Sequence, residues 1–490
     1  MKVEKQSRGQ VLRNMIWKFL ESIGVQIIQL IITIILARLL SPEDYGLMAI
    51  VLVVITFLGI FVNSGISSYL IYMKDIKKSD FLTALVFNIS LSSILVGLLF
   101  LFSDHIAKYY SAPVLDSLIK AMAIILPFNA ISSIYNAYAM KMSLFKALFV
   151  RNMIALPVSG ILSLAFAIMG YGVWSLVIFQ ITYRGLLAII IVLSIKIKID
   201  GEWRLSRSIV TPMLKYGGFT FLSSFIAFVS DSISDLVIGK KINTEQLGYH
   251  NRGYMFPSVF LSIINMVLSD ALFPAFSTYN SDIGELKEKC RKVLKLLYYL
   301  VFPFLFSLFA CAKPLVFTLL TDKWSSAIPI VQIYCLYFLM LPLLQTSSQV
   351  YLATGHVKLR SLGEIIKMCF TILLLFCFIG YGIVAVALAR FFVNILVLVF
   401  TLIVNKYVMG YKFKEFIADI ITPLMISLLM FVSMYSLLLF KASDIVVGIL
   451  QIIVGSIVYL LCLKIMRVSE IEEIKYLIKS KISHSLPSNN

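Results

Sequence analysis

The chain has 490 residues, of which 60% are hydrophobic and only 14% are charged, and its formal net charge is +18. Soluble domains contain about 45–50% apolar and about 25% charged residues, so this composition excludes an ordinary soluble fold. A charge of +18 would suggest a nucleic-acid partner in a soluble protein, but here the position of the charges along the chain decides their meaning.

Apolar runs of about 20 residues, long enough to cross about 30 Å of hydrocarbon as a helix, recur along the whole chain. Backbone groups in lipid must find partners within the protein, so these runs predict transmembrane helices. The sequence therefore predicts an all-α polytopic membrane protein with about fourteen of them. In chain order they are expected at residues 14–40, 45–72, 81–102, 114–140, 148–169, 172–195, 214–239, 250–276, 293–320, 328–353, 360–379, 382–405, 416–440 and 443–466.

The first apolar run follows a basic N-terminus and resembles a signal peptide. It continues to about Leu40 without a small-residue cleavage site, so we expect a retained helix. The six cysteines show no paired spacing and the four histidines are scattered. We therefore expect no disulfide framework, no metal site and no cofactor.

The basic residues alternate in density from one connection to the next. Of the 43 Lys and Arg residues, 32 fall in the segments expected on the side of the N-terminus and 9 on the other side; Arg184 and Arg390 lie within helices. Cytoplasmic loops carry an excess of Lys and Arg, so both termini are expected in the cytoplasm. The polar tail at 467–490 is expected to lie on the membrane surface.

Residues 1–202 recur loosely in residues 203–408. At an offset of 202, residues 40–46 align with residues 242–248. At offsets of 215 and 210, Leu126-Pro127 falls on Leu341-Pro342, and residues 170–172 fall on residues 380–382. The order of these matches predicts an N-lobe (1–202, six helices), a C-lobe (203–408, six helices), two further helices (409–466) and a cytoplasmic tail (467–490). Parallel repeats of this kind are typical of transporters whose site lies between the halves.

Polar residues within apolar helices are candidates for a substrate pathway, because charge in hydrocarbon is costly. The first helix carries a stripe at spacings of three and four, which lies on one face: Lys18, Ser22, Gln26, Gln29 and Thr33. The equivalent helix carries Asp231 and Asp235 at matching positions, and the second helices carry the pair Asn63 and Asn265.

We expect these four helices to line one central cavity, with Asp231 and Asp235 as candidates for ion coupling. Neighbours such as Ile28 and Ile32 are expected to face lipid. The alternative interpretation is that the polar side chains form hydrogen bonds across helix interfaces.

Two arginines form a second constellation. Gln180 and Arg184 are four residues apart in the first repeat. The equivalent positions of the second repeat hold Arg390 and Asn394, so the arginine and the amide residue have exchanged places. Each arginine lies roughly 12–18 Å from a helix end at 1.5 Å per residue, so an anionic partner is expected. A guanidinium offers paired donors that suit phosphate. The alternative is an arginine that ties neighbouring helices together.

Three strings resemble the multidrug/oligosaccharidyl-lipid/polysaccharide exporter superfamily, and within it the Wzx-type lipopolysaccharide/exopolysaccharide flippases. They are ILARLLSPEDYG at 35–46, MSLFKA at 142–147 and GYGVWSLV at 170–177. The resemblance implies a non-enzymatic protein of the bacterial inner membrane. It would move an undecaprenyl-pyrophosphate-linked oligosaccharide from the cytoplasmic to the outer leaflet by alternating access. The implied partners are this lipid-linked oligosaccharide, the bilayer and a polysaccharide polymerase, and no nucleic acid.

The sequence departs from the related peptidoglycan-precursor flippases, whose cavity is strongly cationic. The first helices of the two lobes carry few deep cations, so Arg184, Arg390 or residues at the cavity ends such as Lys18, Arg38 and Arg252 would have to bind the pyrophosphate. Two alternatives stay open. A multidrug antiporter could bind cations at Asp231 and Asp235, but the last two helices are unexplained by it. A polymerase would need a large external loop, and none of the predicted loops is large.

Overall fold

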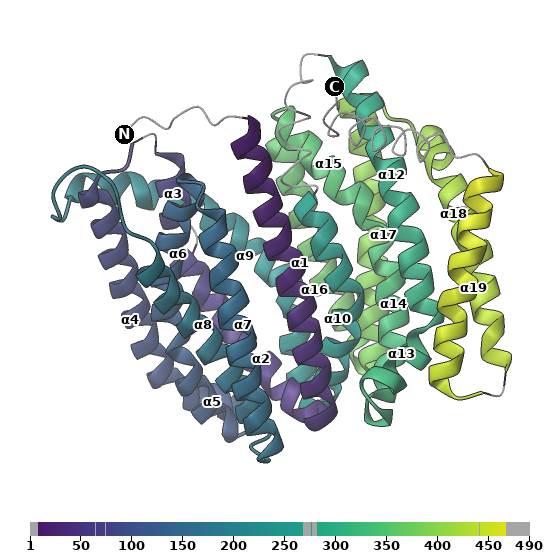
Figure 1. Cartoon of the computed structure of the whole chain (residues 1–490), viewed down its shortest axis with the longest axis horizontal. Coiled ribbons are helices and arrows are strands. Elements are labelled where there is room, and N and C mark those ends of the chain that lie inside the picture. Colours follow the sequence, from purple (N-terminus) through teal and green to yellow (C-terminus); the bar gives the residue numbers. More distant parts are fainter. Residues whose placement is uncertain are drawn as a thin grey trace, which may run out of the picture. The chain divides into compact units, whose positions relative to one another are not determined.

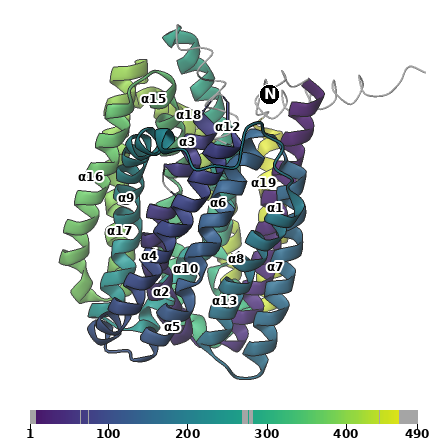
Figure 2. The same ribbon diagram turned by 90° about the vertical axis from the view of Figure 1, so that its left-hand side faces the viewer.

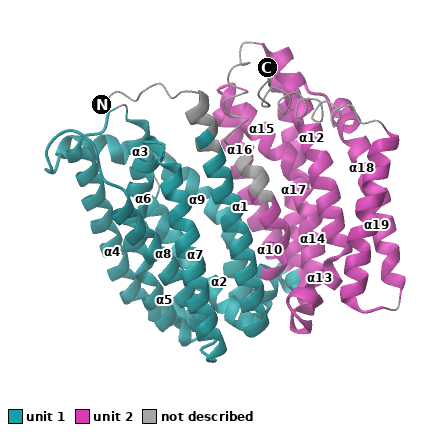
Figure 3. Cartoon of the chain, in the orientation of Figure 1, with its two compact units in different colours: residues 1–251, 379–383 teal, residues 252–378, 384–490 magenta. Residues whose placement is uncertain are grey.

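The structure is a computed structural model that describes residues 8–63, 65–73, 75–267, 276, 282–440 and 442–466 (Figure 1). Contacts divide the chain into two compact units (Figure 3). Unit 1 is Met1–Asn251 with Ile379–Ile383, and unit 2 is Arg252–Phe378 with Val384–Asn490. The surface helix expected at 467–490 lies outside the described residues.

Unit 1 is a bundle of helices. Its elements are α1 (Arg8–Leu39), α2 (Pro42–Asn63), α3 (Ile66–Tyr72), α4 (Lys78–Tyr110), α5 (Val114–Ala123), α6 (Ile125–Lys141), α7 (Phe145–Ile168), α8 (Val173–Ser194), η1 (Arg207–Ile209), α9 (Val210–Lys241), the first residues of α10 (Thr244–Val267) and η4 (Ile379–Tyr381). The helix α7 packs along both α1 and α8, and α4 packs along α6, as Figure 2 shows. A buried cluster that includes Leu70, Phe81, Ile134 and Tyr138 joins α3, α4 and α6.

The contact between α1 and α7 corrects one expectation. Ile32 is only 6% exposed and does not face lipid. It lies over Gly160 of α7, where an added Cβ would come within 2.4 Å of the Ile32 Cδ1 atom. A glycine at this position therefore lets the two helices approach closely, as small residues do between membrane helices.

The helix expected at 45–72 is interrupted. The helix α2 ends at Asn63, and α3 begins at Ile66 after Gly65, whose φ of +98° favours glycine. A Cβ on Gly65 would lie 1.9 Å from the Cα atom of Gly217 in α9. The break therefore follows from a close backbone approach between α9 and the start of α3.

The first turns of α2 and α10 pack closely against each other through residues that are equivalent in the two repeats. A Cβ on Gly46 would lie 1.7 Å from the Thr244 carbonyl oxygen, and a Cβ on Gly248 would lie 1.9 Å from the Pro42 carbonyl oxygen. The pairs Pro42/Thr244 and Gly46/Gly248 are both separated by the repeat offset of 202. Each copy of the repeat thus supplies the glycine that accommodates the backbone of the other.

Unit 2 is also a bundle of helices, with the rest of α10. Its further elements are α12 (Ile283–Ala310), α13 (Ala312–Leu319), η3 (Asp322–Ala327), α14 (Ile328–Phe338), α15 (Leu341–Ala353), α16 (Val357–Phe378), α17 (Ile383–Met409), α18 (Phe413–Ser436), η5 (Leu437–Leu439) and α19 (Asp444–Ile465). Its buried cluster joins α12, α15, α17 and α18 and includes Leu294, Tyr298, Leu343, Val404 and Met430.

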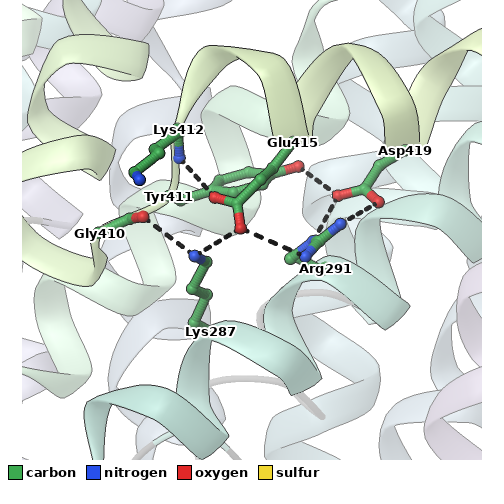
Figure 4. A network of polar contacts seen from close by, with 7 residues as sticks. All are labelled: Lys287, Arg291, Gly410, Tyr411, Lys412, Glu415 and Asp419. Atoms are coloured by element: carbon green, nitrogen blue, oxygen red, sulfur yellow. Dashed lines mark hydrogen bonds and ion pairs between the residues drawn. The ribbon is translucent and has the colours of Figure 1, made fainter.

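A polar network joins α12 to the start of α18 (Figure 4). The Arg291 guanidinium donates two hydrogen bonds, of 2.7 and 2.8 Å, to the Asp419 carboxylate. The Tyr411 hydroxyl donates to the same carboxylate at 2.8 Å, and Lys287 donates to Glu415 at 2.7 Å. Burial and the hydrogen bond to Asp419 raise the pKa of Tyr411 above its usual value, so its hydroxyl remains a donor.

Among the described residues, twelve helices are long and apolar enough to cross a membrane, and a bent pair of helices passes the same test together. The pair is Asp322–Phe338 with Leu341–Ala353, bent by 40°. The polytopic all-helical architecture is confirmed, whereas the count of fourteen is not. The counterpart of the helix expected at 250–276 is α10, which is not among the twelve, and residues 268–275 lie outside the described part.

A break between two helices occurs at equivalent places in the two repeats. Pro342 lies in the first turn of α15, just after α14 ends, and Pro127 lies in the first turn of α6, just after α5 ends. Proline lacks a backbone N–H, so a helix tolerates it in its first turn rather than in its interior. The two compact units, however, divide near residue 251, because α9 packs against α2 and α3. The lobe boundary at 202 stays a prediction from the repeat.

Candidate functional site

Unit 1 contains a cavity of about 540 Å³ between α2, α3, α5, α6, α7 and α8. This volume falls within the range of about 300–1,000 Å³ that is usual for small-molecule sites. Many of its lining residues are polar, namely Asn63, Ser67, Asn129, Ser132, Ser133, Asn136, Arg151, Asn152, Gln180, Tyr183 and Arg184. A polar cavity inside a bundle of apolar helices is the arrangement expected of a transport pathway.

The helix α6 contributes a row of four polar side chains. The row begins at Asn129 and continues three, four and seven residues later with Ser132, Ser133 and Asn136. This spacing places the four side chains on one face of the helix. The spacing in the sequence indicates a polar face on this helix, although the predicted site residues did not include it. The row faces the cavity and positions Asn136 to accept a hydrogen bond from α7.

Arg151 of α7 is the buried cation of the cavity wall. Its side chain is 6% exposed, and its Nη1 atom donates a 2.7 Å hydrogen bond to the Asn136 side-chain oxygen. Its Nε atom is buried and has no hydrogen-bond partner among the described residues. The Glu21 carboxylate of α1 interacts with it electrostatically. Arg151 thus lines the cavity and carries a buried donor that no described residue satisfies.

Asn152 connects three helices beside this arginine. Its Nδ2 atom donates to the Glu21 carboxylate at 2.5 Å, and its side-chain oxygen accepts a hydrogen bond of 3.0 Å from the Tyr183 hydroxyl. The side chains of α1, α7 and α8 are therefore held in one chain of hydrogen bonds. Tyr183 is in turn placed next to the second arginine of the cavity.

Arg184 of α8 supplies the second cation. Its guanidinium lies 5.6 Å from the ring centroid of Tyr183, and Gln180 lines the cavity one turn earlier. No carboxylate pairs with Arg184 in the part of the chain that the structure describes. Arg151 and Arg184 are close enough to repel each other electrostatically. The cavity therefore concentrates positive charge, which an anion would relieve.

Several predicted residues lie in this cavity and others do not. Asn63, Gln180 and Arg184 line it, whereas Gln26 and Gln29 are not among its lining residues. Asp231 is exposed. The side chain of Asn265 lies outside the described residues. A shared cavity for these helices stays a prediction.

Asp235 and Arg390 have local partners. The Asp235 carboxylate lies 3.3 Å from the His250 Nδ1 atom and accepts a 3.5 Å hydrogen bond from Asn251. The Arg390 side chain is 8% exposed and lies 6.0 Å from the ring centroid of Tyr254. These contacts favour a structural role at both positions, although they do not test binding.

Sequence reasoning missed Arg151 although the helix expected at 148–169 contains it, because Arg151 was grouped with Lys141 and Lys146 among the basic residues of the adjacent cytoplasmic segment. The helix α7 begins at Phe145, so Arg151 lies almost two turns inside it. The adjacent Asn152 was a further signal, since paired polar residues rarely occur in a lipid-facing helix. Its partner Glu21 lies 131 residues away in the sequence, so their hydrogen bond could not be read from local spacing.

The family described as polysaccharide biosynthesis protein matches residues 35–329 of the chain. The lipopolysaccharide biosynthesis protein WzxC of Escherichia coli (strain K12) is 23% identical over 430 residues, which cover 85% of this chain and 84% of that protein. The succinoglycan biosynthesis transport protein ExoT of Rhizobium meliloti (strain 1021) is 23% identical over 338 residues, covering 66% of each chain.

Two solved structures are similar in fold. The lipid II flippase MurJ in its inward closed conformation has a TM-score of 0.74 at 17% identity, covering 92% of this chain and 98% of that one. A multidrug resistance MATE family transporter in its inward-facing conformation has a TM-score of 0.57 at 14% identity, covering 81% and 94%. At these identities the similarity concerns the fold.

Proposed function

Because the chain belongs to the polysaccharide biosynthesis protein family, we propose that it is a flippase for an undecaprenyl-pyrophosphate-linked oligosaccharide. It moves this substrate from the cytoplasmic to the outer leaflet by alternating access, for the biosynthesis of a surface polysaccharide. The observation that carries the proposal is the polar cavity of unit 1, in which Arg151 and Arg184 lie within apolar helices. ExoT and WzxC, named for transport and for lipopolysaccharide biosynthesis, support the choice of substrate class.

The chemistry of the cavity matches a pyrophosphate and a sugar. A guanidinium forms paired, charge-assisted hydrogen bonds with phosphate oxygens, and these are stronger than bonds between neutral groups. Amide and hydroxyl side chains such as Asn129, Ser133 and Gln180 can exchange hydrogen bonds with sugar hydroxyls. The polyprenyl chain would remain in the bilayer, because transferring it into a polar cavity is unfavourable.

The antiporter alternative is less well supported. A cavity that binds cationic drugs needs an excess of negative charge, whereas this cavity has two arginines and the nearby Glu21. The family and the relatives ExoT and WzxC are named for polysaccharide or lipopolysaccharide biosynthesis or transport, which supports a transporter rather than a polymerase. We therefore assign no enzymatic activity to the chain.

Other parts of the proposal rest on the sequence alone. They are a bacterial inner-membrane location, contact with a polysaccharide polymerase and ion coupling at Asp231 and Asp235. They also include the participation of Gln26, Gln29, Asp231, Asn265 and Arg390 in substrate binding. Coupling could use a cation gradient or the membrane potential. The polar contacts of Asp235 with His250 and Asn251 give a starting point for tests of coupling.

A flipping assay with purified protein tests the proposed function. Vesicles that contain the protein and a fluorescent polyprenyl-pyrophosphate-linked oligosaccharide are treated with a membrane-impermeant quencher. We expect the accessible fraction to rise from about half to nearly all of the label, because flipping exposes the inner-leaflet pool. Vesicles without protein should stay at about half, and the same result with the protein would contradict the proposal.

Reporter fusions test the orientation. The positive-inside rule places fusions after residues 75, 145, 200, 285 and 410 in the cytoplasm and fusions after 108, 245 and 323 outside. A phosphatase reporter, active only outside, and a fluorescent reporter, active only inside, should give opposite patterns. An external signal after residue 200 would be incompatible with six helices in the first repeat.

A further inference from the structure

Unit 2 has a polar cavity of its own. Its volume is about 220 Å³, and residues of α14, α15, α16 and α17 line it. The offsets of 215 and 210 relate α15 to α6 and α17 to α8, so this cavity lies among the repeat equivalents of helices that line the cavity of unit 1. The repeat has therefore kept a cavity in each copy, with different side chains.

Part of the wall is closed by hydrogen bonds within the protein. The Tyr351 hydroxyl donates to the Asn405 side-chain oxygen at 2.8 Å, and the Asn394 amide donates to the Tyr337 carbonyl oxygen at 3.1 Å. These residues join α15 to α17 and α14 to α17. They give the cavity a rigid side, because their polar groups are already satisfied.

Other lining residues of α15 and α16 contribute further polar and charged groups. The side chains of Gln345 and Ser348 line the cavity and form no hydrogen bond with any described residue. Arg360, Glu364 and Lys367 follow one face of α16 at spacings of four and three. Arg360 is exposed and has no ion-pair partner in the described part of the chain. The charged residues of the lining are thus two cations and one carboxylate, and Gln345 and Ser348 add two neutral side chains without a hydrogen bond to a described residue.

We propose that this cavity binds a single anionic group, a phosphate or a carboxylate, carried either on a sugar or on a lipid headgroup. The net positive charge of its lining selects an anion, and Arg360 offers the planar donors that such a group needs. Glu364 accepts hydrogen bonds from a hydroxyl of the same molecule. At about 220 Å³ the cavity is smaller than the usual range of about 300–1,000 Å³, so it takes one sugar unit or one headgroup rather than an oligosaccharide.

This cavity and the proposed pyrophosphate site share no lining residue. It is formed entirely by residues of unit 2, whereas Arg151 and Arg184 belong to unit 1. A binding experiment without transport therefore tests it alone. A failure of the flipping assay would not contradict anion binding in unit 2. A failure of anion binding in unit 2 would not contradict flipping.

The first experiment measures the affinity of the purified full-length protein, in phosphatidylcholine nanodiscs, for glucose 1-phosphate, glucuronate and glucose. We expect saturable binding of at least one of the two acids and at least tenfold weaker binding of glucose. Arg360→Gln should weaken binding of the acid at least tenfold. Lys358→Gln, which removes an exposed charge two residues away and outside the cavity lining, should leave it unchanged.

The measurement is repeated in an Arg184→Gln background, which removes a cation from the cavity of unit 1. The effect of Arg360→Gln should persist there. A second arm counts phosphatidylglycerol molecules that remain bound after purification. Loss of one such lipid in Arg360→Gln, but not in Lys358→Gln, would identify a headgroup as the ligand. If neither arm depends on Arg360, the proposed anion site is wrong.

Discussion

Replacing Arg184 with glutamine should reduce flipping about 10-fold to 100-fold while membrane levels stay near normal. The guanidinium lines the cavity and has no carboxylate partner among the described residues, so its loss leaves no buried charge unpaired. A hydrogen bond to a charged group contributes about 1.5–3 kcal/mol, and about 1.4 kcal/mol corresponds to a factor of ten. The measurement is the initial rate in the quenching assay, normalised to protein content.

Combining this change with Arg151→Gln should abolish flipping. Removing Arg151 also takes away the stronger of the two cations, Arg151 and Lys18, that stabilise the partly buried Glu21 carboxylate, so protein abundance is expected to fall. Adding Glu21→Gln should restore abundance but not flipping, which separates folding from binding.

Two further variants sharpen the test. Arg184→Lys should retain part of the activity, because it keeps the charge and loses the paired donors. Arg204→Gln, an exposed arginine of the same unit, should behave as wild type. Wild-type flipping by the Arg151→Gln, Arg184→Gln variant would show that the cavity does not bind the pyrophosphate.

The second prediction concerns the network between α12 and α18 in Figure 4. Asp419→Ala should lower the free energy of unfolding by roughly 3 kcal/mol, because it leaves the Arg291 guanidinium without its two-bond partner. We place the value at the low end of the range for buried pairs, since the Arg291 side chain is 34% exposed whereas that of Asp419 is 11% exposed. Tyr411 loses its acceptor as well.

The thermal unfolding midpoint of the purified protein checks this expectation. Glu202→Ala, which breaks an ion pair whose side chains are 76% and 81% exposed, is the matched control and should leave the midpoint unchanged. The double variant Arg291→Met, Asp419→Leu should recover most of the lost stability, because apolar residues can replace a buried ion pair. An unchanged midpoint in Asp419→Ala would mean that the network does not stabilise α18 on α12.

The sequence by itself determined the class of the protein, the approximate position of nearly every helix and the repeated segments. The physical reason is local: an apolar segment in lipid must satisfy its own backbone hydrogen bonds, so about 20 apolar residues in a row specify a helix. The reciprocal contacts of Gly46 and Gly248 occur at the offset of 202 that the sequence suggested. Asn63 and Arg184 were also found from polarity within apolar runs.

Only the tertiary structure decided which polar residues share a cavity. Arg151 lies within the helix expected at 148–169, but its contact with Asn136 depends on how α6 packs against α7. Glu21 and Asn152, 131 residues apart, meet through the packing of α1 on α7. Arg291 and Asp419 meet across 128 residues in the same way. Helix formation depends on neighbouring residues, whereas these contacts depend on long-range packing, which a single sequence does not display.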